Sequence, residues 1–238
     1  MKTIIATGLA LALAGSAASA GDIKGGSSLL DDRSHAQLER WKGAGEFNLT
    51  NVYTRQPGDT SLDFHAAADG KGPTFTLLQL TNAAGDSYLV GGYNPQSWSS
   101  TDGWHVTESD AERTAFLFNM TEPAVYRQVP STYILPSQGS RQTLNESEYG
   151  PAFGAGHDLF VNDRLDTAFS YQLTYGDPRD EGRSIIDRSV GVQLVEVDAM
   201  ELFTLSPVPE PATAALWAAG LGVLRLAARK RKRKACAA

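Results

Sequence analysis

The feature that most limits how this chain can fold is a pair of apolar segments, one at each end of the sequence. Residues 3–14 and 212–224 are rich in apolar side chains and carry no charge, whereas the 189 residues from position 21 to position 209 have a mixed composition. A stretch of that length suits one hydrophobic core. We therefore predict a single domain between two terminal targeting segments.

Residues 1–20 have the three parts of a secretory signal peptide. Lys2 supplies a positive charge, an apolar run follows, and small residues lead to the cleavage sequence Ala18-Ser19-Ala20. A short buried helix is the alternative, but the run has no amphipathic period. We predict export through the inner membrane and cleavage after Ala20. The Gly- and Ser-rich residues 21–28 are then expected to form a loose linker.

Residues 206–238 hold a second signal with three parts in order. The sequence Val208-Pro209-Glu210-Pro211 comes first, and the apolar run of residues 212–224 follows it. A basic cluster comes next: Arg229, Lys230, Arg231, Lys232, Arg233 and Lys234. The run has 13 residues, fewer than the about 20 of a typical span, and predicts a short transmembrane helix rather than a surface helix. The basic residues would stay cytoplasmic and leave the body outside.

This order of parts resembles the PEP-CTERM sorting signal of Gram-negative bacteria over residues 207–234. The resemblance implies that an exosortase, a membrane protease, processes the chain after the export machinery has moved it. The C-terminal helix would anchor the protein transiently, before it reaches the cell surface or the extracellular matrix of a biofilm. Arg225, which interrupts the apolar character, and the four residues after the basic cluster depart slightly from the pattern.

The body between the two signals is acidic, because residues 21–209 carry 13 Lys and Arg against 26 Asp and Glu. This balance argues against nucleic acid as the main partner, since phosphate binding needs a basic face. Cys236 is the single cysteine, which excludes a disulfide scaffold and a cysteine-rich zinc site. The four histidines show no metal-ligand spacing: His35, His65, His105 and His157. We expect no cofactor and no metal.

The body reads as two short helices followed by strands. Capping and stop residues predict helices over residues 34–42 and 60–68, the second with Leu62, His65 and Ala66 on one face. Apolar runs and alternation predict strands at these positions: 74–80, 88–93, 115–120, 159–161, 169–175 and 190–205. The last run changes phase near Leu194, which indicates a bulge or a break. We predict an α+β fold, mainly an antiparallel β-sandwich flanked by two short helices.

Four blocks of the body, in this order, resemble the TLDc domain. They are Asp63-Phe64-His65 with residues 69–74, residues 91–93 with Trp98, residues 115–118, and residues 149–159. The resemblance covers residues 29–205 and leaves residues 206–238 as the sorting segment. It implies a link to oxidation resistance and, in eukaryotes, to the vacuolar proton-pumping ATPase, without an agreed catalytic mechanism. Ala68 and Ala155 depart from the residues common in the family.

The most suggestive candidate site is Gly154, Gly156, His157 and Asp158. A histidine beside an aspartate could form an acid–base or metal pair. Adjacent residues at a strand entry point to opposite faces, however, so we favour a structural role in which the glycines permit a tight turn. Weaker candidates are Glu146 and Glu148 for glycan hydrolysis, Trp98 and Trp104 for sugar stacking, and residues 177–188 for calcium.

No recognisable catalytic constellation is present, so we expect a protein that is not an enzyme. The preferred function is an exported envelope or extracellular-matrix protein whose body is a non-enzymatic binding module. Its ligand would be an extracellular polysaccharide or an envelope protein. The alternative is an oxidative-stress-protection or hydrolytic enzyme centred on His157 and Asp158.

Overall fold

The computed structural model describes residues 21–130 and 139–208. The chain divides into two units, and residues 21–207 form one of them. The predicted signal-cleavage residues, the sorting residues after Val208 and the basic cluster lie outside the described residues. Val208 itself is half-buried. Within the described ranges, no helix is long and apolar enough to cross a membrane.

Two helices form where the sequence predicts them. Helix α1 spans Asp32–Lys42 and begins earlier than expected, because Asp31 caps it by accepting a hydrogen bond of 2.7 Å from the Ser34 amide. Gly43 ends α1 with a φ of 70°. Helix α2 spans Ser61–Ala68 as predicted, and the Asp63 carboxylate accepts a hydrogen bond from the Thr60 amide at 2.8 Å.

The face of α2 that carries Leu62, His65 and Ala66 is only partly buried. Leu62 is 64% exposed and Ala66 is exposed, whereas His65 is buried. Phe64, His65 and Ala68 face the protein interior. The short helix has almost no amphipathic pattern, so the position of the neighbouring loops decides which residues are buried.

Twelve strands of the described residues join in one hydrogen-bonded sheet. Their bounds are β1 Ile23–Lys24, β2 Phe47–Thr54, β3 Thr74–Thr81, β4 Ser87–Asn94, β5 Gly103–Val106, β6 Phe116–Asn119, β7 Ala124–Arg127, β8 Arg141–Asn145, β9 Ala152–Phe153, β10 Leu159–Val161, β11 Thr167–Phe169 and β12 Val195–Pro207. The order is β5-β8-β9-β10-β11-β12-β3-β4-β6-β7, and β2 pairs with β12 and β1. Every pair in this sheet is antiparallel except β1 with β2.

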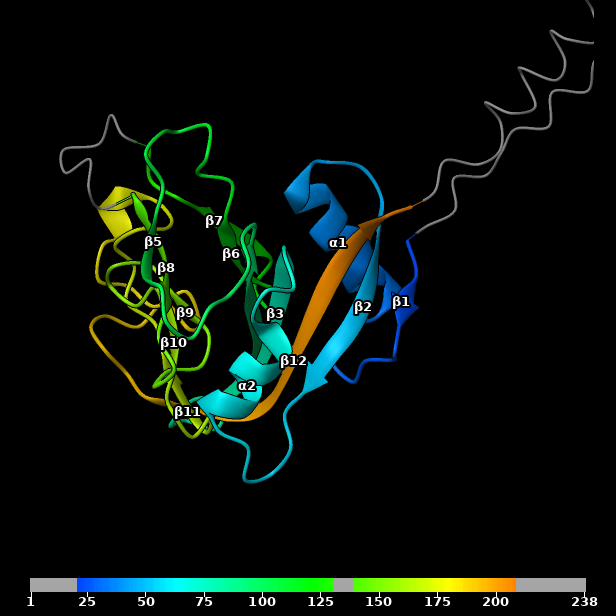
Figure 1. Ribbon diagram of the computed structural model, residues 1–238. Helices are drawn as coiled ribbons and strands as arrows, with labels where there is room; N and C mark the ends of the chain where they lie inside the picture. Colours follow the sequence, from blue (N-terminus) through cyan, green and yellow to red (C-terminus); the bar gives the residue numbers. More distant parts are fainter. Residues whose placement is uncertain (1–20, 131–138, 209–238) are drawn as a thin grey trace, which may run out of the picture. The chain divides into compact units, whose positions relative to one another are not determined.

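The sheet folds into two layers around the main core. Figure 1 shows β5 and β8–β11 together on one side and β2, β3 and β12 on the other. The layers are not separate sheets, because β12 pairs with β11 at its start and with β2 and β3 along the rest of its length. Phe153 and Leu159 from one layer meet Leu78 and Met200 from the other. The predicted antiparallel, β-rich α+β fold is confirmed.

A second core lies under α1. Leu38 of α1 is fully buried among Phe47, Phe75 and Phe203 of the sheet, and Trp41 stacks on Phe118 at 5.8 Å between ring centroids. Both cores consist of residues within 21–207. We therefore expect the body of residues 21–207 to fold without the two terminal segments.

The segment of residues 21–28, expected to be a loose linker, is part of the fold. Ile23 pairs with Leu49 through β1 and β2. The Glu201 carboxylate, on a side chain only 1% exposed, accepts hydrogen bonds from the Ser28 amide at 2.8 Å and from the hydroxyls of Ser28 and Ser27. We call this contact the Glu201 clasp. A Gly- and Ser-rich composition suggested flexibility, but here small residues let the backbone approach a buried carboxylate.

Two predicted strands are shorter than expected. Strand β11 ends at Phe169, and the alternation is lost beyond it: Ser170, Gln172, Thr174 and Tyr175 are buried, while Tyr171 and Leu173 are half-buried. The polar side chains point inward because they bond to the interior backbone, as Ser170 does to the Asp158 carbonyl at 2.6 Å.

The last strand begins at Val195, so the predicted break near Leu194 is present. Residues 190–194, which were expected to belong to the strand, lie outside it. Val190, Val192 and Leu194 are exposed at 68%, 53% and 65%. Their alternation resembles that of a strand, but the segment does not join the sheet ladder.

Candidate functional site

Asp158 is a fully buried carboxyl group that holds backbone rather than a ligand. Its Oδ1 atom accepts hydrogen bonds from the amides of Leu173, Thr174 and Tyr175 at 2.7, 2.8 and 2.8 Å. Burial raises the pKa of Asp158 to about 7, although these amides oppose the shift by favouring the ionised form. The side chain thereby fixes the irregular segment after β11 against the entry of β10.

The two glycines of the block leave room for that arrangement. A Cβ atom on Gly154 would lie 2.0 Å from the Asp158 Oδ2 atom, and Gly154 has a φ of 79°. A Cβ atom on Gly156 would lie 2.7 Å from the Tyr171 carbonyl oxygen. Gly154 is therefore required both by its backbone angle and by close approach, and Gly156 by close approach.

Gly154→Ala is expected to lower the free energy of unfolding by about 2 kcal/mol, because it combines a left-handed backbone angle with a collision against Asp158. Gly26→Ala is the matched control, since Gly26 has a φ of 74° but a Cβ atom there would meet no other atom within 4 Å. Urea denaturation of both variants separates the two contributions. Equal losses in the two variants would contradict a packing role for Gly154.

His157 has an unusual backbone and faces away from Asp158. Its φ of 56° lies in the left-handed region, and its amide donates to the Gly154 carbonyl at 3.0 Å. Among the described residues, no hydrogen bond joins the side chains of His157 and Asp158, and the His157 Nδ1 atom has no partner. Burial lowers the pKa of His157, which favours the neutral imidazole.

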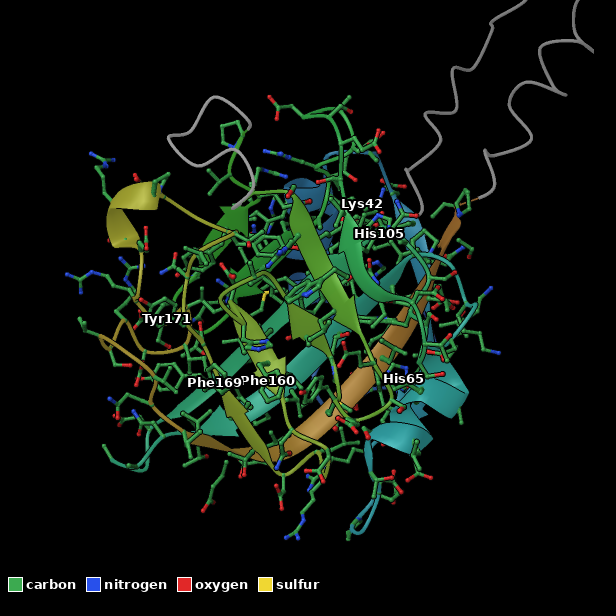
Figure 2. All side chains as sticks on the ribbon, turned by 60° about the vertical axis from the view of Figure 1, so that its left-hand side comes forward. Lys42, His65, His105, Phe160, Phe169 and Tyr171 are labelled. Atoms are coloured by element: carbon green, nitrogen blue, oxygen red, sulfur yellow. The ribbon has the colours of Figure 1, made fainter. Side chains whose placement is uncertain are left out.

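The imidazole of His157 lies among aromatic rings. Its centroid is 4.7 Å from Phe160, 5.8 Å from Phe169, 6.4 Å from Trp104 and 6.5 Å from Tyr149. We call these five residues the aromatic cluster. All five are half-buried. Figure 2 shows Phe160 and Phe169 close together on the layer of β10 and β11.

An open groove of about 600 Å³ adjoins the aromatic cluster. One wall is the start of α2, residues 60–62; the other is the loop of residues 147–149. Phe160 of β10 and the turn after it, with Asn162 and Asp163, complete the lining. We call it the α2 groove. Tyr149 and Phe160 belong to both the groove and the cluster, so the two form one surface.

His65 fixes one wall of the groove. It is 4% exposed, and its Nδ1 atom lies 2.7 Å from the Asp69 carboxylate. Its Nε2 atom lies 3.0 Å from the Glu146 carbonyl and 3.1 Å from the Tyr149 carbonyl. Because α2 is thus joined to the loop that carries Tyr149, the groove is built on rigid elements.

The other sequence candidates are divided among different places. Trp98 is 1% exposed and donates to the Thr74 hydroxyl at 3.0 Å, so it belongs to the core, whereas Trp104 belongs to the aromatic cluster. Glu148 lines the α2 groove together with Asp163, a second carboxylate that the sequence did not single out. Glu146 contributes its carbonyl to His65.

The acidic run of residues 177–188 contains internal ion pairs. Asp177 pairs with Arg179, and Asp180 lies 2.7 Å from Arg188 and 3.4 Å from Arg183. In the parts of the chain that the structure describes, no three His, Cys, Asp or Glu side chains are grouped so as to hold a metal ion. The charges of this loop are therefore largely balanced within it.

The groove residues that sequence reasoning missed are Leu62, Tyr149, Phe160 and Asp163. They come from three separate segments, and no local motif connects them. The sequence carries no local signal for them, because the structure alone shows that Leu62 is exposed and that Phe160 lies between two buried residues of its strand.

Comparison with protein-family models gives two matches. A PEP-CTERM protein-sorting motif matches residues 207–232, which marks the chain as an exported protein that an exosortase processes. A search of curated proteins finds no match. A TLDc domain matches residues 23–206, including most of the segment that the sequence assigned to a linker. Since this match covers well over half of the chain, the protein belongs to the TLDc domain family.

Proposed function

We propose that this protein acts outside the cytoplasm as a non-enzymatic binding module. Residues 1–20 direct export and are removed after Ala20. The apolar run near the C-terminus anchors the chain in the inner membrane until an exosortase cleaves it. The body then remains on the surface or in the extracellular matrix of a Gram-negative, biofilm-forming cell, where it binds a polysaccharide or an envelope protein.

The observation that supports a binding role is the division of His157 and Asp158 between two environments. The Oδ1 atom of Asp158 accepts hydrogen bonds from three backbone amides, its Oδ2 atom is buried without a partner among the described residues, and the His157 ring lies in the aromatic cluster. Catalysis by the pair would need both groups to converge on one reacting atom. The open groove with adjoining rings suits binding better than such chemistry.

One observation favours the alternative, an oxidative-stress-protection or hydrolytic enzyme. His157 combines a left-handed backbone with a ring nitrogen that has no partner among the described residues. Strain of this kind gathers at functional sites. The enzyme hypothesis is therefore best tested as catalysis by His157 without Asp158.

One experiment on the body of residues 21–207 distinguishes the binding function from the enzymatic one. We expect saturable retention on isolated envelopes of the producing cell, and equal retention for Asp158→Asn, because the Asp158 side chain is fully buried and its charge does not reach the binding surface. Peroxide-consumption and ester- and glycoside-hydrolysis assays run in parallel. Turnover that disappears in His157→Gln, or the absence of envelope binding by a folded body, would contradict the proposal.

A further inference from the structure

The surface formed by the α2 groove and the aromatic cluster has the chemistry of a particular class of ligand. Its apolar part consists of one exposed leucine and a set of half-buried rings. Leu62 stands 64% exposed at the groove, and Phe160 lies 5.0 Å from Phe169 and 5.2 Å from Tyr149 between ring centroids. Such rings offer wide apolar faces at a small cost in conformational entropy.

The rings are also held in place. Leu159 and Val161, on either side of Phe160, are fully buried in the main core, so β10 presents Phe160 outward from a fixed strand. The loop that carries Tyr149 is bonded to His65 of α2 through the Glu146 and Tyr149 carbonyls. The surface is therefore preorganised, which lowers the cost of binding a rigid partner.

The polar groups of the groove select against negative charge. Glu148 and Asp163 are exposed carboxylates, and within the described residues neither side chain has a hydrogen-bond partner; the same holds for the Tyr149 hydroxyl. In the part of the chain that the structure describes, no lysine or arginine lines the groove. A complementary ligand must offer hydroxyl or amine donors and must lack phosphate, sulfate and carboxylate groups.

Two macromolecules meet that requirement: a neutral polysaccharide and a basic peptide. An ion pair with an exposed carboxylate contributes little, because water screens it. Most of the available affinity therefore comes from apolar contact with the rings and Leu62. The flat faces of pyranose rings carry C–H groups that stack on aromatic rings while their hydroxyls donate to carboxylates, whereas a lysine or arginine side chain would use the rings less fully.

We propose that this surface binds a neutral polysaccharide, by stacking of sugar rings on Phe160, Phe169 and Tyr149 and by hydroxyl donation to Glu148 and Asp163. The inference rests on the proposed function, because it names the ligand class of the same binding module. It also makes that function more specific, since uronate-rich and phosphorylated polymers are excluded.

The test measures binding of the 21–207 body to three classes of probe. The neutral probes are hexasaccharides of linear glucan, mannan and galactan. The anionic probe is an alginate hexasaccharide, and the basic probe is a decapeptide of alternating Lys and Ser. We expect at least one neutral hexasaccharide to bind and alginate not to bind. Leu62→Ala and Asp163→Asn should each weaken that binding about five- to tenfold. Leu194→Ala is the matched control, because Leu194 is 65% exposed and lies outside the groove.

Circular dichroism of every variant establishes that it is folded before binding is compared. Binding of the basic decapeptide alone, with the same sensitivity to Leu62→Ala, would overturn the polysaccharide while leaving a binding module. Envelope retention that is unchanged in Leu62→Ala and Asp163→Asn would overturn this surface as the site. A folded body that binds neither the envelope nor any probe would overturn the proposed function itself.

Discussion

Asp158→Ala is expected to lower the free energy of unfolding by about 4 kcal/mol or more, the largest effect that we expect of a single substitution in this protein. The substitution leaves the amides of Leu173, Thr174 and Tyr175 without their acceptor in a place where water does not reach. Urea denaturation at pH 6 measures the loss. A variant within about 1 kcal/mol of the natural protein would show that the segment after β11 does not depend on this side chain.

Asp158→Asn tests the charge separately, because the amide keeps an oxygen for the three donors. The pKa of Asp158 is raised from 3.8 to about 7 by burial, so the folded protein binds a proton that the unfolded chain releases above pH 3.8. Its contribution to stability is complete below pH 3.8 and is lost as the pH rises through about 7. We expect Asp158→Asn to remove this fall in stability between pH 4 and pH 7. A fall that persists unchanged in the variant would mean that another group causes it, and that burial does not raise the pKa of Asp158.

Glu201→Ala is expected to lower the free energy of unfolding by about 3 kcal/mol, because the Glu201 clasp joins a buried carboxylate to the amide and hydroxyl of Ser28 and to the Ser27 hydroxyl. Glu196→Ala is the control on the same strand, since Glu196 is exposed. Hydrogen exchange should show residues 21–30 losing protection in Glu201→Ala alone. Unchanged protection would mean that β1 and the second core hold this segment without the clasp.

The helices, β3 and β4 could be predicted because their signals are local, whereas β2, which is equally long, was missed. Asp31, Thr60 and Gly43 act within a few residues of the helix ends, and the apolar runs that became β3 and β4 are buried on both faces. The segment after β11 could not be predicted in the same way. Its alternation pointed to a half-buried strand, but Asp158, at least 15 residues earlier in the chain, binds the amides of residues 173–175, and Ser170, Gln172 and Thr174 are buried together with Tyr175.

Residues of the candidate site could likewise be selected only where they are adjacent in the sequence. Gly154, Gly156, His157 and Asp158 were selected as a contiguous block, and the structure gives close packing to both glycines and backbone bonds to Asp158. The α2 groove could not be selected from the sequence, because its walls meet only through tertiary contacts such as those of His65. Leu62 was placed on one face of α2 with His65 and Ala66, and nothing in the sequence shows that this leucine stays 64% exposed.

The place where both ends of the body leave the sheet has a mechanical consequence. Leu49 of β2 pairs with Ile23 on one side and with Leu205 on the other, so the first and last strands of the body flank β2 at the same end. A pull applied at Pro207 along β12 runs perpendicular to the hydrogen bonds that join β12 to β2 and β3. These bonds would share the load in shear instead of opening one after another. A body pulled at its C-terminal end can therefore resist the load without peeling from that end.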